Sequence, residues 1–236
     1  MTQLAISIWN WLLSRQARER PVKDAAEKLQ MSMRVTAKCR YNAAVRLQRQ
    51  GKFAFFTTTV LSLGLIFIPL MQNAGVPLAY KSNVLNMMQI FLAVAVLVYS
   101  VVIGTARYEY RAENLTECGD KLKELIRSLD KDRETKGTFS NEDLAKVQER
   151  YSDIATDTEN HTRSDYRLAM LEMNNDYFIT GVPRLFEYLF AYTDRFTAYV
   201  VPILMIAFEV VFITDMIGVT NVLAPYFNGT TVPVSG

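Results

Sequence analysis

Two long uncharged stretches dominate the pattern of apolar and polar positions along the chain. Residues 53–71 are nineteen residues without a charge, and residues 84–104 are twenty-one more after a connection of only twelve. At about 1.5 Å per residue, each stretch forms a helix of about 30 Å, the thickness of a bilayer's hydrocarbon core. Helices in the core of a soluble domain keep a polar stripe, whereas Lys81 in the connection is the only charge between residues 53 and 104. The pattern predicts a transmembrane helical hairpin.

A third apolar stretch, residues 196–219, contains the acids Glu209 and Asp215. Its thirteen Leu, Ile, Phe and Val residues favour insertion by about 4–8 kcal/mol in all, and Glu209 near the middle opposes it by about 2.5–3.5 kcal/mol. The balance predicts a third span. It follows an aromatic-rich segment, residues 177–199, whose rings suit the headgroup level. A re-entrant or interfacial helix is the alternative for residues 196–219.

The polar segments also show helical spacing. Residues 3–13 predict a helix with an apolar, tryptophan-bearing face that either lies in the membrane interface or packs on other helices. Residues 22–52 predict a helix that runs into the first span, and helix continues from residue 107 to about residue 131 before Gly137 breaks it. Ser140 begins another helix, with Asp143 three residues on as in a capping box.

Two apolar ladders in this region have the three-and-four spacing of a helix–helix seam. They should pack as an antiparallel pair. The ladders are Tyr108, Leu115, Cys118, Leu122, Leu125 and Leu129, and then Leu144, Val147, Tyr151, Ile154, Thr158, His161 and Leu168.

The expected fold class is therefore an all-α membrane protein with a transmembrane helical hairpin, a cytoplasmic antiparallel helical pair and a third C-terminal span. The segments are cytoplasmic basic or amphipathic helices at 1–52, the hairpin at 53–104, a cytoplasmic helical region at 105–195, the third span at 196–219 and an outward tail at 220–236.

The distribution of charge gives the orientation. The net charge is +2, but residues 1–52 hold eleven Lys and Arg against three Asp and Glu, whereas residues 105–195 hold fourteen against nineteen. Basic residues flank both chain ends of the hairpin, and its connection has Lys81 alone. Because Lys and Arg near spans stay inside the cell, the N-terminus should be cytoplasmic. Cys39 and Cys118 then lie in a reducing compartment and are expected to be packed thiols.

Five cations before the first span form a basic patch. It either binds nucleic acid or forms a juxtamembrane belt attracted to anionic lipid headgroups. We favour membrane lipid as the partner and do not expect direct binding of nucleic acid. The patch consists of Arg34, Lys38, Arg46, Arg49 and Lys52.

The motifs of catalysis are absent from the sequence: it has no phosphate-cradling glycine loop, no paired metal-binding cysteines and a single histidine, His161. We therefore expect no enzyme, no catalytic residue, no cofactor and no metal site.

The spans hold the remaining candidates, Thr58, Ser62 and Glu209, as pore-lining residues. The hydroxyls of Thr58 and Ser62 share one helix face and either line a wet path or permit close packing. In a homo-oligomer, one Glu209 per subunit would form an anionic ring. The alternative is a neutral or hydrogen-bonded carboxyl group.

Two segments beside the spans carry a family resemblance. Residues 39–47 run into the first span, and residues 107–112 leave the second. With the short hairpin between them, they resemble the SLATT family, the SMODS and SLOG-associating two-transmembrane effectors of prokaryotes. The similarity covers about residues 22–195, looks closest to the subclass linked to reverse transcriptases, and leaves a third span as a departure from the family name. The motif positions are Arg40, Tyr41, Asn42, Arg46, Arg107, Tyr108, Glu109 and Arg111.

The resemblance implies a membrane effector of an antiphage or other conflict system in the bacterial inner membrane. Such a protein would oligomerise and form a pore, or disrupt the membrane, when a partner senses infection. The partner would be a neighbouring sensor such as a reverse transcriptase or a nucleotide-signal synthase. The alternative is a non-conducting membrane anchor or scaffold for a partner enzyme such as a reverse transcriptase.

Overall fold

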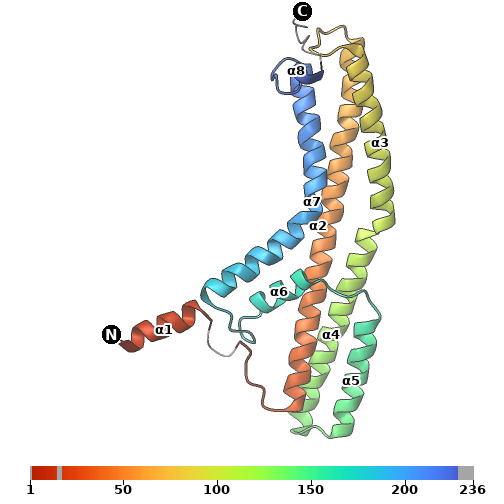
Figure 1. The fold of residues 1–236 in the computed structure, drawn as a ribbon. Helices are drawn as coiled ribbons and strands as arrows, with labels where there is room; N and C mark the ends of the chain where they lie inside the picture. Colours follow the sequence, from red (N-terminus) through yellow and green to blue (C-terminus); the bar gives the residue numbers. More distant parts are fainter. Residues whose placement is uncertain (1, 15–17, 228–236) are drawn as a thin grey trace, which may run out of the picture. The chain divides into compact units, whose positions relative to one another are not determined.

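The computed structural model describes residues 2–14 and 18–227, and most of these are helical (Figure 1). Within these ranges there is no strand, only an isolated bridge between Glu19 and Tyr177. The expected all-α fold is confirmed, and residues 228–236 of the expected tail lie outside the described residues. The helices are α1 Thr2–Leu12, α2 Ala25–Asn73, α3 Ser82–Ala106, α4 Tyr108–Lys136, α5 Asn141–Thr156, α6 Arg163–Glu172, α7 Gly181–Met216 and α8 Ala224–Phe227.

Among the described residues, three helices are long and apolar enough to cross a membrane: α2, α3, whose apolar stretch precedes α4, and α7. The 49-residue α2 joins the basic segment and the first span in one uninterrupted helix, as the sequence predicts. The 36-residue α7 begins at Gly181 in the aromatic-rich segment and continues through the third apolar stretch.

The chain divides into two compact units. The first, here called the polar unit, comprises residues 1–49 and 108–197; the second, the apolar unit, comprises residues 50–107 and 198–236. Helices α2 and α7 each contribute one half to each unit.

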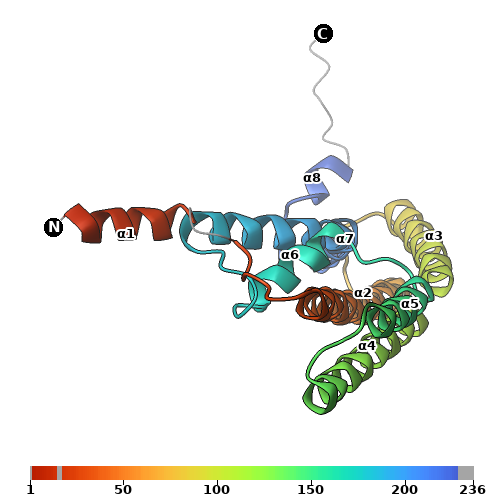
Figure 2. The same ribbon diagram turned by 90° about the horizontal axis from the view of Figure 1, so that it is seen from below.

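In the polar unit, α4 and α5 form an antiparallel hairpin beside the first half of α2 (Figures 1 and 2). Met33 of α2 packs with Leu125, Ile126 and Leu129 of α4, and Tyr151 of α5 joins this cluster. The predicted antiparallel pair is thus confirmed. The caps follow the sequence, since Ser140 Oγ accepts the backbone N–H of Asp143 and Gly137 after α4 has a φ of 75°.

The helix predicted from Ser140 through Leu168 is wrong in its length. The helix α5 ends at Thr156, and α6 begins at Arg163. Thr162 and Asp165 form a capping box, each side chain bonded to the other's backbone N–H, which starts a new helix at this point. The ladder residue His161 therefore lies in the connecting loop, stacked on Tyr166.

A second interruption separates α3 from α4. Arg107 adopts the left-handed conformation, with φ 46° and ψ 45°, where the sequence predicts continuous helix. Arg107 is exposed, and its charge marks the end of the uncharged stretch.

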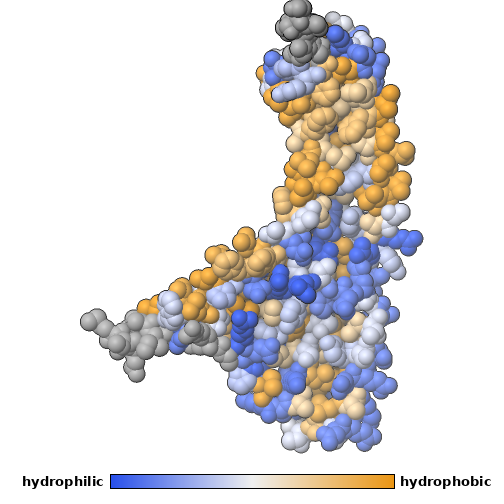
Figure 3. Space-filling model, in the orientation of Figure 1, coloured by the Kyte–Doolittle hydropathy of each residue, from blue (hydrophilic) through white to orange (hydrophobic). Residues whose placement is uncertain are grey.

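The end of α1 is bonded to the segment that precedes α7. Thr180 Oγ1 donates to the carbonyl oxygen of Trp11 at 2.6 Å, and Ser14 Oγ donates to that of Phe178 at 3.4 Å. Trp9 and Trp11 remain more than half exposed. The tryptophan-bearing part of α1 is thus left open. The first half of α7 has the same apolar, open character, with exposed Leu185, Phe186, Leu189, Phe190 and Phe196 (Figure 3).

Gly181 is required at this joint for two reasons. Its φ is +58°, and a Cβ there would lie 2.1 Å from the carbonyl oxygen of Leu12. Gly137 also has a positive φ but has nothing within 4 Å of such a Cβ. We expect Gly137→Ala to cost about 1–2 kcal/mol for the backbone alone. Gly181→Ala should cost about 1–3 kcal/mol more, because the overlap is with backbone that must move.

Denaturant unfolding of the two variants, followed by circular dichroism, measures this difference. Equal losses for the two variants would contradict a packed joint between α1 and the start of α7.

In the apolar unit, the second half of α2 packs with α3 and the second half of α7. Leu61 and Ile68 of α2 lie in one cluster with Leu85 of α3 and Phe212 of α7. Tyr80 in the α2–α3 connection stacks on Phe212 with ring centroids 4.6 Å apart. The outer faces carry exposed aliphatic and aromatic side chains, as a lipid-facing surface requires (Figure 3).

Candidate functional site

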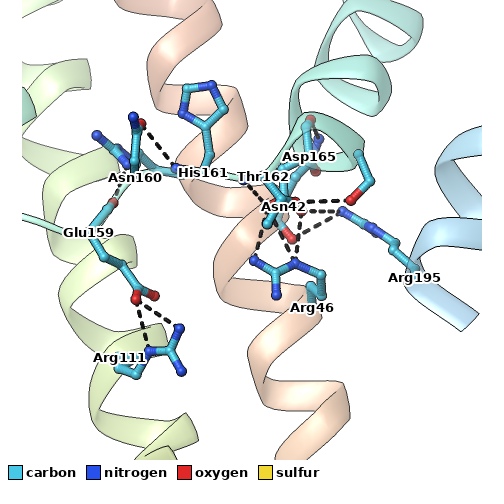
Figure 4. Close-up of polar contacts among 11 residues, drawn as sticks. Asn42, Arg46, Arg111, Glu159, Asn160, His161, Thr162, Asp165 and Arg195 are labelled. Atoms are coloured by element: carbon cyan, nitrogen blue, oxygen red, sulfur yellow. Dashed lines mark hydrogen bonds and ion pairs between the residues drawn. The ribbon is translucent and has the colours of Figure 1, made fainter. Parts of the chain in front are cut away.

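A buried ion-pair network in the polar unit is centred on Asp165 at the start of α6 (Figure 4). Asp165 is 0% exposed, and its carboxylate accepts hydrogen bonds from Arg46 of α2 at 3.1 Å and from Arg195 of α7 at 2.9 Å. It also accepts the backbone N–H of Thr162 at 3.1 Å and the Thr162 hydroxyl at 2.8 Å. One carboxylate thus joins three helices.

The electrostatics of Asp165 follow from two opposed effects. Burial by itself raises the pKa of this carboxyl group, but the hydrogen bonds from Arg46 and Thr162 and the charge of Arg46 outweigh it and hold the pKa below its ordinary value. Asp165 is therefore ionised at neutral pH, which matches its two arginine partners.

Arg40 holds the other end of the α5–α6 loop. It is 3% exposed and donates to the carbonyl oxygens of Glu159 and, at 2.9 Å, Ala155. These carbonyls lie at and beyond the C-terminus of α5, where a helix lacks backbone donors and favours a cation. Arg111 of α4 pairs with the Glu159 carboxylate at 2.8 Å (Figure 4).

His161 lies in the same loop and is half-buried. Burial and the charge of Arg40 lower its pKa, so the imidazole is neutral at pH 7. In the described part of the chain, no group of three or more His, Cys, Asp or Glu residues is arranged to hold a metal ion.

The motif positions beside the spans divide into two groups. Arg40, Arg46 and Arg111 hold the α5–α6 loop and α6, and Tyr41 donates to Asp120 at 2.6 Å. The Asn42 carbonyl oxygen accepts from Arg195 at 3.2 Å. Tyr108 packs against the Ala43, Ala44 and Leu47 cluster, whereas Arg107 and Glu109 are exposed.

The predicted basic patch is largely paired within the polar unit. Arg34 pairs with Asp176 at 2.7 Å, Lys38 with Glu172 at 2.9 Å and Arg46 with Asp165. Arg49 and Lys52 are exposed. Three of the five charges thus have carboxylate partners, and binding of anionic lipid by the remaining ones stays a prediction.

The apolar unit holds an unpaired carboxyl group. Glu209 of α7 is 1% exposed, and neither of its carboxylate oxygens has a hydrogen-bond partner among the described residues. Its side chain lies against the backbone of Gly64 in α2, where an added Cβ would be 1.8 Å from Glu209 Oε1. Only glycine at position 64 leaves space for this carboxyl group.

A groove of about 470 Å³ between α2 and α7 runs beside this contact. Besides Gly64 and Glu209, its lining is entirely apolar, with Leu63, Phe67 and Ile213 among it. Thr58 and Ser62 are not among the lining residues, and the Thr58 hydroxyl donates to Ala54 of its own helix at 3.0 Å. The structure therefore does not bring the three predicted pore-lining residues together in a single chain.

Asp215, the second acid of α7, has a different environment. It is 0% exposed and accepts the backbone N–H groups of Val222, Leu223 and Ala224, together with the hydroxyl of Tyr80 at 3.3 Å. This carboxylate ties the end of α7 to the turn before α8.

The pattern of residues along the chain does not predict a role for Asp165, Glu159, Arg195 or Asp176. A local signal exists only for Asp165, because Thr162 followed three residues later by an acid is a helix-start pattern. The other three carry no local signal.

A comparison with known protein families identifies the family of this chain. The family model described as SMODS and SLOG-associating 2TM effector domain family 5 matches residues 22–214. The match continues beyond the expected limit at residue 195 and includes most of α7. Searches of curated proteins and of solved structures gave no match. With a family match across most of the chain and helices long and apolar enough to span a membrane, this protein belongs to family 5 of the SMODS and SLOG-associating 2TM effector domains.

Proposed function

We propose that this membrane effector of a conflict or defence system acts by oligomerising and forming a pore, or otherwise disrupting the membrane. Membership of the effector family supplies the membrane effector role. Pore formation is the further step, and the unpaired carboxyl group of Glu209 is the observation that carries it.

Burying this carboxyl group inside a span costs free energy. A carboxylate inside a span is unfavourable and normally faces a protein partner or a water-filled cavity. In the single chain, Glu209 has neither and lies sealed against Gly64. A state in which α7 turns or separates from α2 would expose the carboxylate to water, and association of several chains would supply the wet path.

The outer faces of the spans provide the surface for association. In an apolar segment of 18 residues within the α3–α4 stretch, only 11% is buried inside the protein, and in the corresponding segment of α7 the buried share is 17%. Such faces contact lipid in one chain and can contact further copies in an oligomer. Thr58 and Ser62 remain the candidate hydroxyl lining in that assembly.

In this proposal the polar unit holds the resting state and receives the signal. The partner is a neighbouring sensor, either a reverse transcriptase or a nucleotide-signal synthase. The resemblance of residues 39–47, the hairpin and residues 107–112 to the reverse-transcriptase-linked subclass is the reason to test a reverse transcriptase first. The protein lies in the bacterial inner membrane with its N-terminus in the cytoplasm, as the positive charges beside the spans indicate. No catalytic step by this chain is required.

Liposomes that contain the purified full-length protein test this proposal. We expect release of a trapped dye and a preference for cations. Glu209→Gln should reduce cation flux by about tenfold, because the anionic ring is lost. Glu134→Gln, at an exposed position of α4, is the matched control and should leave flux unchanged.

A pore is excluded by two results together. Liposomes would retain the dye at every protein-to-lipid ratio, and cells that express the protein with its neighbouring genes would keep their membrane potential unchanged. These results would favour the scaffold alternative, in which the spans only anchor a partner enzyme.

A further inference from the structure

A cationic pocket of about 560 Å³ lies in the polar unit between α2 and α4. Four basic side chains line it, Arg34 and Lys38 from α2 and Lys123 and Arg127 from α4. We propose that this pocket binds a small phosphate-bearing molecule of the nucleotide type. The proposal is independent of pore formation, since it concerns binding alone.

The charge in the pocket is only partly balanced. Arg34 and Lys38 have carboxylate partners in Asp176 and Glu172. Lys123 and Arg127 have no ion-pair partner in the described ranges 2–14 and 18–227. Two cations therefore remain for a ligand. A lysine ammonium binds phosphate as a point charge and an arginine guanidinium binds it through two parallel hydrogen bonds, so the pair suits a phosphate group.

The wall formed by Tyr41 is held in place before any ligand binds. Its hydroxyl donates to Asp120 at 2.6 Å, and the ring packs so closely on Gly119 that an added Cβ would lie 2.8 Å from Tyr41 Cζ. The Lys123 ammonium lies 4.2 Å from the centre of this ring. The attraction of a cation to a half-buried tyrosine ring is weaker than a charge-assisted bond to phosphate, so a phosphate group would be the stronger partner for Lys123.

The volume and lining of the pocket favour a small organic phosphate over a bare ion. Its volume falls in the range of about 300–1,000 Å³ that is typical of small-molecule sites. Ala37, Ile126 and Met173 add apolar contacts beside the cations. Such a mixture fits a molecule with a charged phosphate end and a flat, less polar end, as in a nucleotide. An anionic lipid headgroup shares the phosphate chemistry and is distinguished by the experiment.

Full-length protein in phosphatidylcholine nanodiscs is titrated with ATP, and separately with adenosine, by calorimetry at about 0.15 M salt, where exposed charges are largely screened. We expect saturable ATP binding that adenosine does not reproduce. Lys123→Gln and Arg127→Gln should each weaken binding at least tenfold. Lys131→Gln, which removes an exposed cation from the same helix outside the pocket, should change it less than twofold. Thermal unfolding of each variant checks that the fold is kept.

Nanodiscs that contain phosphatidylglycerol separate the two sources of phosphate. Unchanged ATP affinity assigns the pocket to a free nucleotide, and loss of ATP binding in these discs assigns it to a lipid headgroup. The proposal is overturned if ATP fails to bind in phosphatidylcholine discs, if adenosine binds as well as ATP, or if Lys131→Gln weakens binding as much as Arg127→Gln. None of these outcomes depends on liposome leakage.

Discussion

Replacing Asp165 with alanine is expected to destabilise the polar unit by about 3–5 kcal/mol, the usual cost of removing one partner from a buried ion pair. The change leaves Arg46 and Arg195, whose side chains are each only 14% exposed, without their shared carboxylate. It also removes the N3 acid of the capping box at the start of α6. Because whole domains are stable by only about 5–15 kcal/mol, the loss should be visible as a large fall in the denaturant midpoint.

Asp132→Ala is the matched control, because Asp132 is an exposed acid of α4 and its removal should change stability by less than about 0.5 kcal/mol.

Acid titration gives a second measurement. Since the pKa of folded Asp165 lies below its ordinary value, its stabilising effect should be complete above about pH 4 and disappear as the pH falls through the folded pKa. Asp165→Asn should remove that part of the acid dependence. If Asp165→Ala is as stable as Asp132→Ala, the ion-pair network does not hold the α5–α6 loop.

Asp215→Asn is expected to destabilise the apolar unit by about 3 kcal/mol, because hydrogen bonds to a charged group contribute about 1.5–3 kcal/mol each and one acceptor oxygen is lost. The carboxylate accepts three consecutive backbone N–H groups, from Val222 to Ala224. Thermal unfolding of the protein in detergent, followed by circular dichroism, measures the loss.

Glu209→Gln is the informative comparison, since it removes the other acid of α7 and also keeps the side-chain shape. Because Glu209 has no hydrogen-bond partner, its neutral analogue should unfold at or above the temperature of the unmodified protein. If both substitutions lower the unfolding temperature equally, the distinction between a structural acid at position 215 and a functional one at position 209 is lost.

The environments of Asp215 and Glu209 could not be predicted from the residues around them in the sequence. Both lie in one apolar stretch, where each opposes insertion, and for Glu209 the sequence leaves open an anionic ring or a neutral, hydrogen-bonded carboxyl group. The acceptor role of Asp215 depends on the turn at residues 217–223, and the seal around Glu209 depends on a glycine more than a hundred residues earlier. No periodicity within α7 contains that information.

The partners of the cations in the basic segment of α2 could not be predicted from the local sequence either. Its cations predict a patch, but Arg34, Lys38 and Arg46 have carboxylate partners on segments far along the chain. The helix predicted to reach Leu168 fails for a related reason. Apolar spacing continued past Thr156, but Arg40 and the Thr162–Asp165 capping box stabilise a break that the spacing does not reveal.

By itself, the sequence determined which segments are helical and which of them can enter a membrane, because a span requires a long uncharged stretch and the ends of helices have local signals at Ser140 and Gly137. Those properties depend on neighbours along the chain. Only the tertiary structure decided which charges are paired and which carboxyl group is left alone, as the contrast of Asp165 with Glu209 shows. The physical reason is that pairing and burial depend on helix faces brought together from distant segments, and the free energy of a charge is set by those neighbours rather than by its own segment.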